Sequence, residues 1–203
     1  MGQLARSGAI LATLCLASAA AAADFSDPTW PCIQRKVETL SPGLMWPSPV
    51  EDTAFDAETE AAVADLAGRM ALRRVSLEEL ETQVAAFTAA QGRDPSLLGH
   101  VFMTAFDALA AQRHRIMKGI EDYSLKQIKL AERIDTARTE MDNLMAADAP
   151  DYDRVDALEE QIAWDERIYT DRQKSLTYVC ETPVLLEKRL YAIAQMLQDA
   201  MRE

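Results

Sequence analysis

The sequence predicts an all-α protein built on one long antiparallel coiled-coil helical hairpin. Two shorter helices are expected at the open end of the hairpin, preceded by an extended N-terminal strap. Apolar residues alternate at spacings of three and four from Phe106 to Leu197, and the two halves of this run pair about a polar turn near 148–151. This pattern is typical of two helices packed along a common seam.

Residues 1–23 are interpreted as a secretory signal peptide that is cleaved near Ala23. Arg6 supplies the positive charge, an alanine-rich apolar segment follows, and small residues precede Asp24. A transmembrane anchor is the alternative, but the apolar stretch is short and no stop-transfer charges follow it. A lipoprotein is disfavoured because a leucine, not a small residue, precedes Cys15. The mature protein is expected in the periplasm, with no stable membrane insertion.

Residues 24–55 are rich in proline and tryptophan, and we expect them to form an extended strap over the hairpin. Proline excludes regular helix across most of this segment. Trp30 and Trp46 would then cover apolar surface. The alternative is that both tryptophans form a recognition patch with Arg35 and Lys36, because exposed Trp and Arg are common interface anchors.

Two cysteines remain after processing, Cys32 and Cys180, and an isolated pair in an oxidising compartment predicts one disulfide. Closing a loop of about 150 residues would stabilise the fold by roughly 5 kcal/mol in the chain-entropy model. Cys180 follows Val179, which the seam sets opposite Ile120, so the disulfide would hold the strap against the middle of the hairpin. An intermolecular disulfide or a redox pair is the alternative, although a thiol oxidoreductase would normally show Cys-x-x-Cys.

Two short helices are expected over residues 56–74 and 76–91. Asp56 is an N-cap for the first, Ser76 opens a capping box for the second, and Gly92 ends it. Each helix has one apolar face, so both are expected to pack on the open end of the hairpin. The hairpin residues expected in that contact are Phe102, Phe106, Leu190 and Ile193.

The hairpin arms are expected over residues 95–147 and 151–202, with Asp94 and Pro95 starting the first arm. The facing seam pairs include Leu144 with Val155, Met141 with Leu158, Leu130 with Tyr169, and Tyr123 with Leu176. Pro183 predicts a kink and not a loop, because the heptad phase continues beyond it. The alternative is an ordinary globular helix pair, whose 3.6-residue stripe would drift out of phase over this many turns.

Polar residues enter the seam at three positions. Gln127 and Arg172 are expected to face each other, and Asp165 is expected to pair with Arg138 or Arg133. Unpartnered buried polar groups are costly, so we interpret this set as a lock on the register of the two arms. A polar pocket that binds a ligand between the arms is the alternative, and heptad packing leaves little volume for it.

The chain is acidic, with 33 Asp and Glu against 21 Lys and Arg, and its formal charge of −12 becomes −13 when Arg6 is removed with the signal. Such a charge repels nucleic acid and anionic lipid, so we expect neither as a partner. The basic stretch from Arg113 to Lys118 is interpreted as a solvated helix face.

The sequence shows no recognisable catalytic, metal or cofactor motif. A di-metal bundle needs Glu-x-x-His, but Leu97 and Ala111 stand three residues before His100 and His114. Haem-attachment, zinc-protease and serine-hydrolase motifs are also absent from the sequence. We therefore expect a protein that is not an enzyme, has no catalytic residues and binds no metal or cofactor.

Two segments resemble stretches in uncharacterised exported bacterial helical proteins. They are residues 31–37 (PCIQRKV) and residues 175–190 (SLTYVCETPVLLEKRL). The resemblance implies an exported, periplasmic location and no particular activity.

Together these features favour a periplasmic protein-binding accessory, adaptor or chaperone-like assembly factor, because a projecting hairpin offers a long surface and little concave volume. The expected contact residues are Trp30, Arg35, Lys36, Trp46, Met145 and Tyr152. The alternative is a helical small-ligand-binding or sensor domain with a pocket at the hairpin base. The identity of the protein partner does not follow from the sequence, and homo-oligomerisation stays open.

Overall fold

The computed structural model describes residues 27–202, and all regular structure in this range is helical. The predicted signal peptide, residues 1–23, lies outside the described residues. The elements are a short 3-10 helix η1 (Pro42–Leu44), followed by α1 (Ala57–Met70), α2 (Leu77–Gln91), α3 (Pro95–Met145) and α4 (Tyr152–Ala200). The all-α class predicted from the sequence is confirmed for this range.

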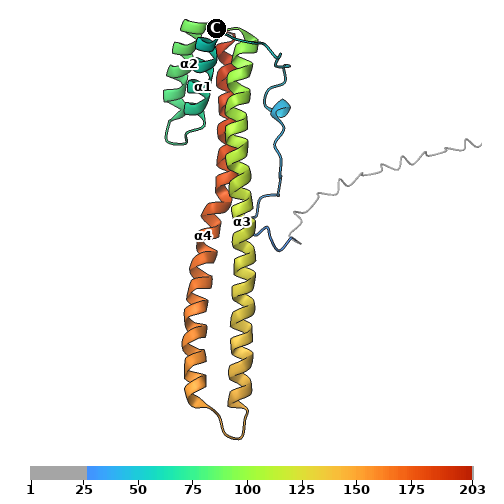
Figure 1. Cartoon of the computed structure of the whole chain (residues 1–203), viewed down its shortest axis with the longest axis vertical. Coiled ribbons are helices and arrows are strands. Elements are labelled where there is room, and N and C mark those ends of the chain that lie inside the picture. The colour runs from blue at the N-terminus through green and yellow to red at the C-terminus, as the bar shows by residue number, and fades with distance from the viewer. Residues whose placement is uncertain (1–26, 203) are drawn as a thin grey trace, which may run out of the picture.

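Helices α3 and α4 lie side by side in opposite directions and define the long axis of the molecule (Figure 1). They contain 51 and 49 residues, and each therefore spans about 75 Å at 1.5 Å per residue. Residues 146–151 connect them at one end, which we call the tip. Helices α1 and α2 lie at the other end, the base, together with the C-terminal end of α4 (Figure 1).

The helices begin at the capping residues that the sequence indicated. The Asp56 carboxylate accepts a hydrogen bond from the Thr59 amide at 2.8 Å, and Ser76 Oγ accepts one from the Glu79 amide at 3.1 Å. These bonds satisfy amide groups that have no partner within the first helical turn. Helix α2 stops at Gly92, whose φ of 90° is a left-handed conformation that favours glycine.

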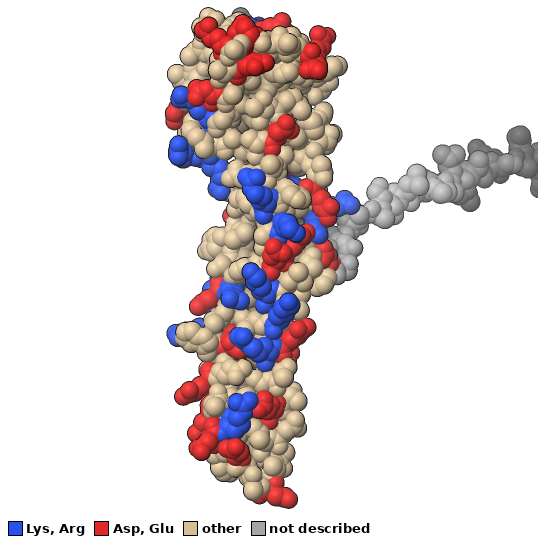
Figure 2. Space-filling model, in the orientation of Figure 1, with Lys and Arg blue, Asp and Glu red and all other residues tan. Residues whose placement is uncertain are grey.

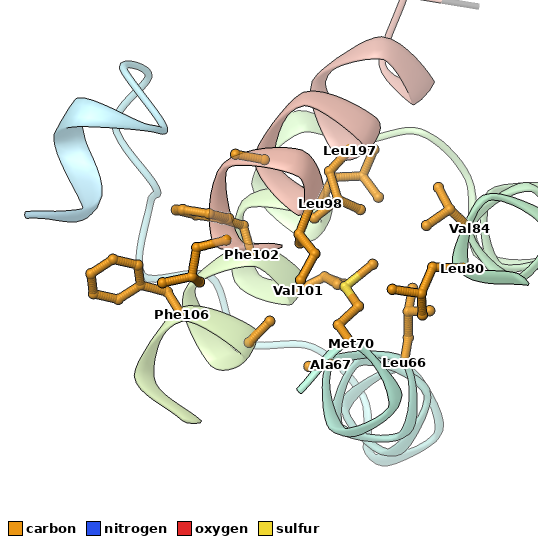
Figure 3. Packing of buried hydrophobic residues seen from close by; sticks show 14 of the residues in the cluster. Leu66, Ala67, Met70, Leu80, Val84, Leu98, Val101, Phe102, Phe106 and Leu197 are labelled. Atoms are coloured by element: carbon orange, nitrogen blue, oxygen red, sulfur yellow. The ribbon is translucent and has the colours of Figure 1, made fainter. Parts of the chain in front are cut away.

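The largest hydrophobic core lies at the base, where α1 packs on α3 and α2 packs on α4. Fully buried side chains from all four helices meet there, among them Met70, Leu80, Leu98, Phe102 and Leu197 (Figure 3). Trp46 adds its ring from the strap and stacks on Phe102, with ring centroids 5.1 Å apart. The predicted packing of the short helices on the open end of the hairpin is confirmed.

Two smaller clusters follow along the hairpin. One lies about halfway along, at what we call the waist, and contains Trp30, Cys32, Met117, Ile120 and Cys180. The other lies toward the tip and contains Leu130, Ile134, Ala137, Leu158 and Ile162, with Met141, Leu144 and Tyr169 packed against it. The predicted pairs Leu130 with Tyr169 and Met141 with Leu158 fall within this cluster.

Between these two clusters the predicted seam is wrong at one position. Val179, which was expected to face Ile120, has an exposed fraction of 42%, and Cys180 is buried in its place. Helix α4 continues through Pro183 without a loop, as predicted. Proline has no amide hydrogen to bond the carbonyl of Val179, four residues earlier, and α4 bends near the middle of its length (Figure 1).

The strap, described from residue 27 to residue 55, runs along α3 from the waist to the base (Figure 1). At the waist Ser124 Oγ donates to the Pro28 carbonyl at 2.8 Å. At the base His100 Nε2 lies 2.8 Å from the Glu51 carbonyl oxygen. The strap is therefore fastened at both ends of its path.

Candidate functional site

The waist is the place where the strap is joined covalently to α4, against the side of α3. Cys32 of the strap and Cys180 of α4 form a disulfide within the chain, with their Cα atoms 5.5 Å apart. Both cysteines are buried and pack against Ile120 of α3. The disulfide thus lies against the middle of the hairpin, in the position that the sequence predicted.

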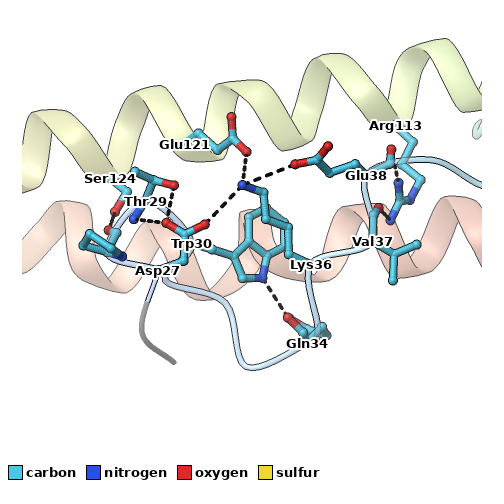
Figure 4. Close-up of polar contacts among 11 residues, drawn as sticks. Asp27, Thr29, Trp30, Gln34, Lys36, Val37, Glu38, Arg113, Glu121 and Ser124 are labelled. Carbon is cyan, nitrogen blue, oxygen red and sulfur yellow. Dashed lines mark hydrogen bonds and ion pairs between the residues drawn. The ribbon is translucent and has the colours of Figure 1, made fainter. Parts of the chain in front are cut away.

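One ion pair fastens the strap to α3 near this disulfide, and a second holds two parts of the strap together. Lys36 Nζ lies 2.7 Å from Glu121 Oε1 and 3.2 Å from Asp27 Oδ2 (Figure 4). These hydrogen bonds, first the one to Glu121, raise the pKa of Lys36 above its ordinary value. Hydrogen bonds from the Thr29 hydroxyl and amide, and then from Lys36, lower the pKa of Asp27. Lys36, expected as a partner contact, is thus engaged within the chain.

Arg113 connects the three elements above the waist. Its Nε donates to Glu187 Oε1 of α4 at 2.7 Å, and its Nη2 donates to the Val37 carbonyl of the strap at 2.6 Å. A longer bond of 3.4 Å reaches the Glu38 carbonyl (Figure 4). The Arg113 side chain is only 4% exposed. The interpretation of this basic stretch as a solvated face is therefore wrong for Arg113, because its charge is partnered inside the fold.

The two strap tryptophans are packed inside the molecule. Trp30 is buried at the waist and donates from Nε1 to the Gln34 carbonyl at 2.7 Å, and Trp46 is buried at the base. Their burial leaves them no surface for a recognition patch, so they cover apolar surface instead. Arg35 is exposed beside them.

The predicted contact residues at the tip have accessible side chains. Met145 ends α3 and is 52% exposed, and Tyr152 begins α4 and is 63% exposed. They flank the connection of residues 146–151. The tip therefore presents two large apolar side chains to the outside.

The polar residues of the seam have the expected partner in one case and a different one in the other, because Asp165 pairs with Arg133, one of its two expected arginines, while Gln127 does not pair with Arg172. Gln127 Nε2 donates to the Tyr169 carbonyl at 3.1 Å and not to Arg172. Asp165 is buried and accepts from Arg133 Nε at 2.8 Å. Arg138 pairs with Glu166, the neighbour of Asp165, because positions 133 and 138 point about 140° apart around α3 and reach different carboxylates.

A cavity of about 530 Å³ opens beside the disulfide, between the strap, α3 and α4. We call it the waist cavity. Among the residues that line it are Ile33, Gln34, Gln127, Ile128, Leu176 and Glu181. The expectation that heptad packing leaves little volume is wrong here, because the bend in α4 interrupts the seam between the waist and tip clusters. Pro183 was the residue in the sequence that indicated a bend in this arm.

A second hollow lies at the base, where the alternative hypothesis placed a pocket. It has a volume of about 430 Å³ and lies under the strap, between Trp46, Val50 and His100. Trp46 and Val50 belong to the strap and His100 to α3. A neighbouring hollow of about 540 Å³ lies between Phe55 of the strap, Val63 of α1 and His100 of α3, so the hollows at the base are similar in size to the waist cavity.

Within residues 27–202, no three His, Cys, Asp or Glu side chains are grouped so as to hold a metal ion. No helix in that range has the length and apolar character needed to cross a membrane. Comparison with protein-family models, curated proteins and solved structures gives no match. The function is therefore inferred from the arrangement of the residues themselves.

The outer face of α4 carries a stripe of large apolar side chains that the sequence reasoning missed. Trp164, Tyr178 and Leu185 are 61%, 74% and 44% exposed. They are spaced by fourteen and seven residues, so all three share one heptad position, the one that precedes the seam's d position in the sequence, and exposed Asp171 occupies the same position between Trp164 and Tyr178. We call these residues the α4 stripe. Assigning heptad positions to the outer face of the second arm, and not only to its seam, would have identified the α4 stripe.

Charge is unevenly distributed along the molecule. On the face shown in Figure 2, acidic side chains gather at the base and near the tip, while lysine and arginine side chains gather along the middle. Arg167 and Lys174 lie on α4 between Trp164 and Tyr178 and are exposed. The α4 stripe is thus accompanied by charges of both signs, because Lys174 lies 3.6 Å from Asp171 and exposed Glu181 stands between Tyr178 and Leu185.

Proposed function

We propose that the protein is an exported, non-enzymatic binding accessory, and that its hairpin holds a partner protein in the periplasm. The observation that carries this proposal is the α4 stripe, in which large apolar side chains repeat at heptad spacing on an outer helix face. Exposed aromatic side chains in a row are a common feature of binding surfaces. The predicted signal peptide and the disulfide support export to an oxidising compartment.

The occupant that best fits the α4 stripe is a partner helix. Residues that share one heptad position match the repeat of a helix that packs along the outer face of α4 in a coiled coil. Arg167 and Lys174 stand three and four residues from Trp164 and Tyr178, the spacing of neighbours on a helix surface. The partner helix should therefore carry apolar residues in heptads, flanked by acidic residues.

This proposal treats the paired arms as a true coiled coil. The support is that apolar residues at the predicted a and d positions of both arms are buried in the tip cluster. A coiled coil keeps its outer positions in register over many turns, which a regular stripe requires. Arg35, Met145 and Tyr152 are exposed additional contacts, at the waist and at the tip.

Site-specific photocrosslinking in the producing cell tests the proposal. A photoreactive phenylalanine analogue at position 164 or 178 should give one discrete adduct of the same mass, and the analogue at exposed position 125 on α3 is the matched control. The adduct should disappear when Trp164→Ala is combined with the analogue at 178. Equal adducts at 125 and 164, or none at 164 and 178, would refute the stripe as the binding surface. An adduct of twice the chain mass would show a homo-oligomer instead.

A second candidate function is favoured by the waist cavity. A volume of about 530 Å³ lies in the range of sites that bind small molecules. This volume supports a ligand-binding site at the waist, between the arms, which the sequence analysis gave as one alternative beside a pocket at the hairpin base. It does not depend on the α4 stripe.

A further inference from the structure

The wall of the waist cavity contains buried hydrogen-bond acceptors without partners. Gln127 is 6% exposed, and its Nε2 is bonded to the Tyr169 carbonyl, which settles the orientation of the amide. Its Oε1 is buried and accepts no hydrogen bond, and Oε1 of Gln34 across the cavity is in the same state. A buried acceptor without a partner costs about 1–3 kcal/mol. Both residues line the cavity, and a rotation that brings Oε1 to its surface lets either side chain accept a donor from a ligand. In Gln127 this rotation exchanges the bond to Tyr169 for one to the ligand.

The charged residues around the cavity all have the same sign. Glu132, Asp135 and Glu181 contribute to its lining, and no lysine or arginine does. Of these, Asp135 has a basic neighbour, Arg138 Nη1, at 3.6 Å. A hollow bordered only by negatively charged side chains concentrates cations and excludes anions.

The remaining lining is largely apolar or neutral. Ile33 of the strap, Ile128 of α3 and Leu176 of α4 come from three different elements, and the disulfide closes one side. Such a lining favours a ligand with a hydrocarbon body. Because the strap supplies part of the wall, the cavity exists only while the strap is fastened.

We propose that the waist cavity binds a small organic ammonium ion with an apolar body. Its N–H groups donate to the amide oxygens of Gln127 and Gln34, and its charge is balanced by Glu132, Asp135 and Glu181. Its hydrocarbon part packs on Ile33, Ile128 and Leu176. This inference deepens the second candidate function, on which it rests, because it names the class of ligand for the waist cavity, and it is independent of partner binding by the α4 stripe.

The test uses the mature chain with its disulfide intact and three six-carbon ligands that differ in head group. Hexylammonium, hexanol and hexanoate are titrated separately, and binding is followed by calorimetry and by the side-chain amide signal of Gln127. Hexylammonium should bind saturably, at least tenfold more tightly than hexanol, while hexanoate should not bind. Equal affinity for hexylammonium and hexanol would overturn the proposal, as would the absence of saturable binding by hexylammonium.

Variants separate the acceptors from the charge. Gln127→Leu removes the acceptor, Glu132→Gln removes one exposed rim charge without altering the core, and Gln195→Leu is the control at an exposed glutamine near the base. The first two should weaken hexylammonium binding by about tenfold and about threefold, and the control should not. If neither Glu132→Gln nor Gln127→Leu changed the affinity for hexylammonium, the proposal would be overturned. If Gln127→Leu does not fold, Gln34→Leu takes its place in the experiment.

A lysine side chain of a partner protein carries the same chemical group as a free alkyl amine. Nα-acetyl-lysine methylamide, titrated in parallel, distinguishes these two sources. It should bind more weakly than hexylammonium, because its amide ends do not match the apolar part of the cavity. Tighter binding of the lysine derivative would overturn the assignment to a free small molecule.

Discussion

At the scale of single residues, the polar side chains inside the hairpin show where sequence reasoning stops. The heptad phase placed Gln127 on the seam, whereas Arg113 was interpreted as part of a solvated face, and both are buried. Their partners are a strap carbonyl, a carboxylate on α4 and a carbonyl on α4. Periodicity identifies which face of a helix is buried, but backbone carbonyls from a segment without periodicity leave no trace in the pattern.

Arg113→Ala should lower the free energy of unfolding by about 2–3 kcal/mol, because hydrogen bonds to charged groups are worth about 1.5–3 kcal/mol. The substitution leaves the Val37 carbonyl without its donor and Glu187 without its cation. Arg115→Ala, at an exposed position two residues away, should change the free energy of unfolding by less than about 0.5 kcal/mol. Urea unfolding followed by circular dichroism measures both, and equal effects of the two substitutions would contradict the burial of Arg113.

Two glycines of α3 should respond in opposite ways to alanine. A Cβ at Gly119 meets nothing within 4 Å, so Gly119→Ala should stabilise the helix by about 0.5–1 kcal/mol. A Cβ at Gly99 would lie 2.9 Å from Val50 Cγ2, so Gly99→Ala must displace the strap at the base. Thermal unfolding should show a higher Tm for Gly119→Ala and a lower Tm for Gly99→Ala. A rise in both would show that the strap is not held against Gly99.

The attachment of the strap at Asp27 and Lys36 should have a defined pH range. The pKa of Asp27 is lowered from 3.8, so its contribution is present above pH 3.8 and is lost as the pH falls through the folded value. The pKa of Lys36 is raised from 10.5, so its contribution is present below pH 10.5 and is lost only at higher pH.

The amide resonance of Thr29, which donates to Asp27, reports this attachment. Its chemical shift should stay constant between about pH 5 and pH 9 and move in acid, below the ordinary aspartate value near 4. Asp27→Asn should abolish the movement in acid. A transition centred near pH 6 to 7 would show that another group controls the strap.

At the scale of elements, the sequence predicted the helices well and the routes between them poorly. Asp56, Ser76 and Asp94 start their helices because a short polar side chain satisfies the first free amides, which is a local effect. The waist cavity was not predicted. It results from one proline, one disulfide and the path of the strap acting together, and none of these alone specifies an empty volume.

Removal of the disulfide should free the waist end of the strap while the base core stays folded. The double variant Cys32→Ala and Cys180→Ala should lower the free energy of unfolding by about 2–5 kcal/mol. Amides of residues 27–36 should exchange faster in this variant, while those of α1 and α2 should not. Chemical reduction of the wild type is the control and should give the same pattern. Unchanged exchange at 27–36 would show that the ion pairs at Lys36 alone fasten the strap.

At the scale of the whole molecule, stability should fall from the base toward the tip. The base core joins four helices and the strap, while the tip cluster contains only five buried residues from two helices. Among residues 27–202, the arms beyond the waist have no neighbouring helix but each other (Figure 1). A hairpin built in this way can open at the tip without disturbing the base, which suits a surface that adapts to a partner.

Native-state hydrogen exchange tests this gradient directly, because local opening needs less free energy where fewer apolar contacts are broken. Amides of residues 98–109 and 186–197 should exchange only through global unfolding, whereas those of 134–144 and 155–162 should exchange through smaller openings with weaker dependence on urea. Val155→Ala, in the tip half, should accelerate exchange near the tip only. If all these amides exchanged through one common opening, the hairpin would be a single cooperative rod, and the tip half would have no independent freedom to adapt to a partner.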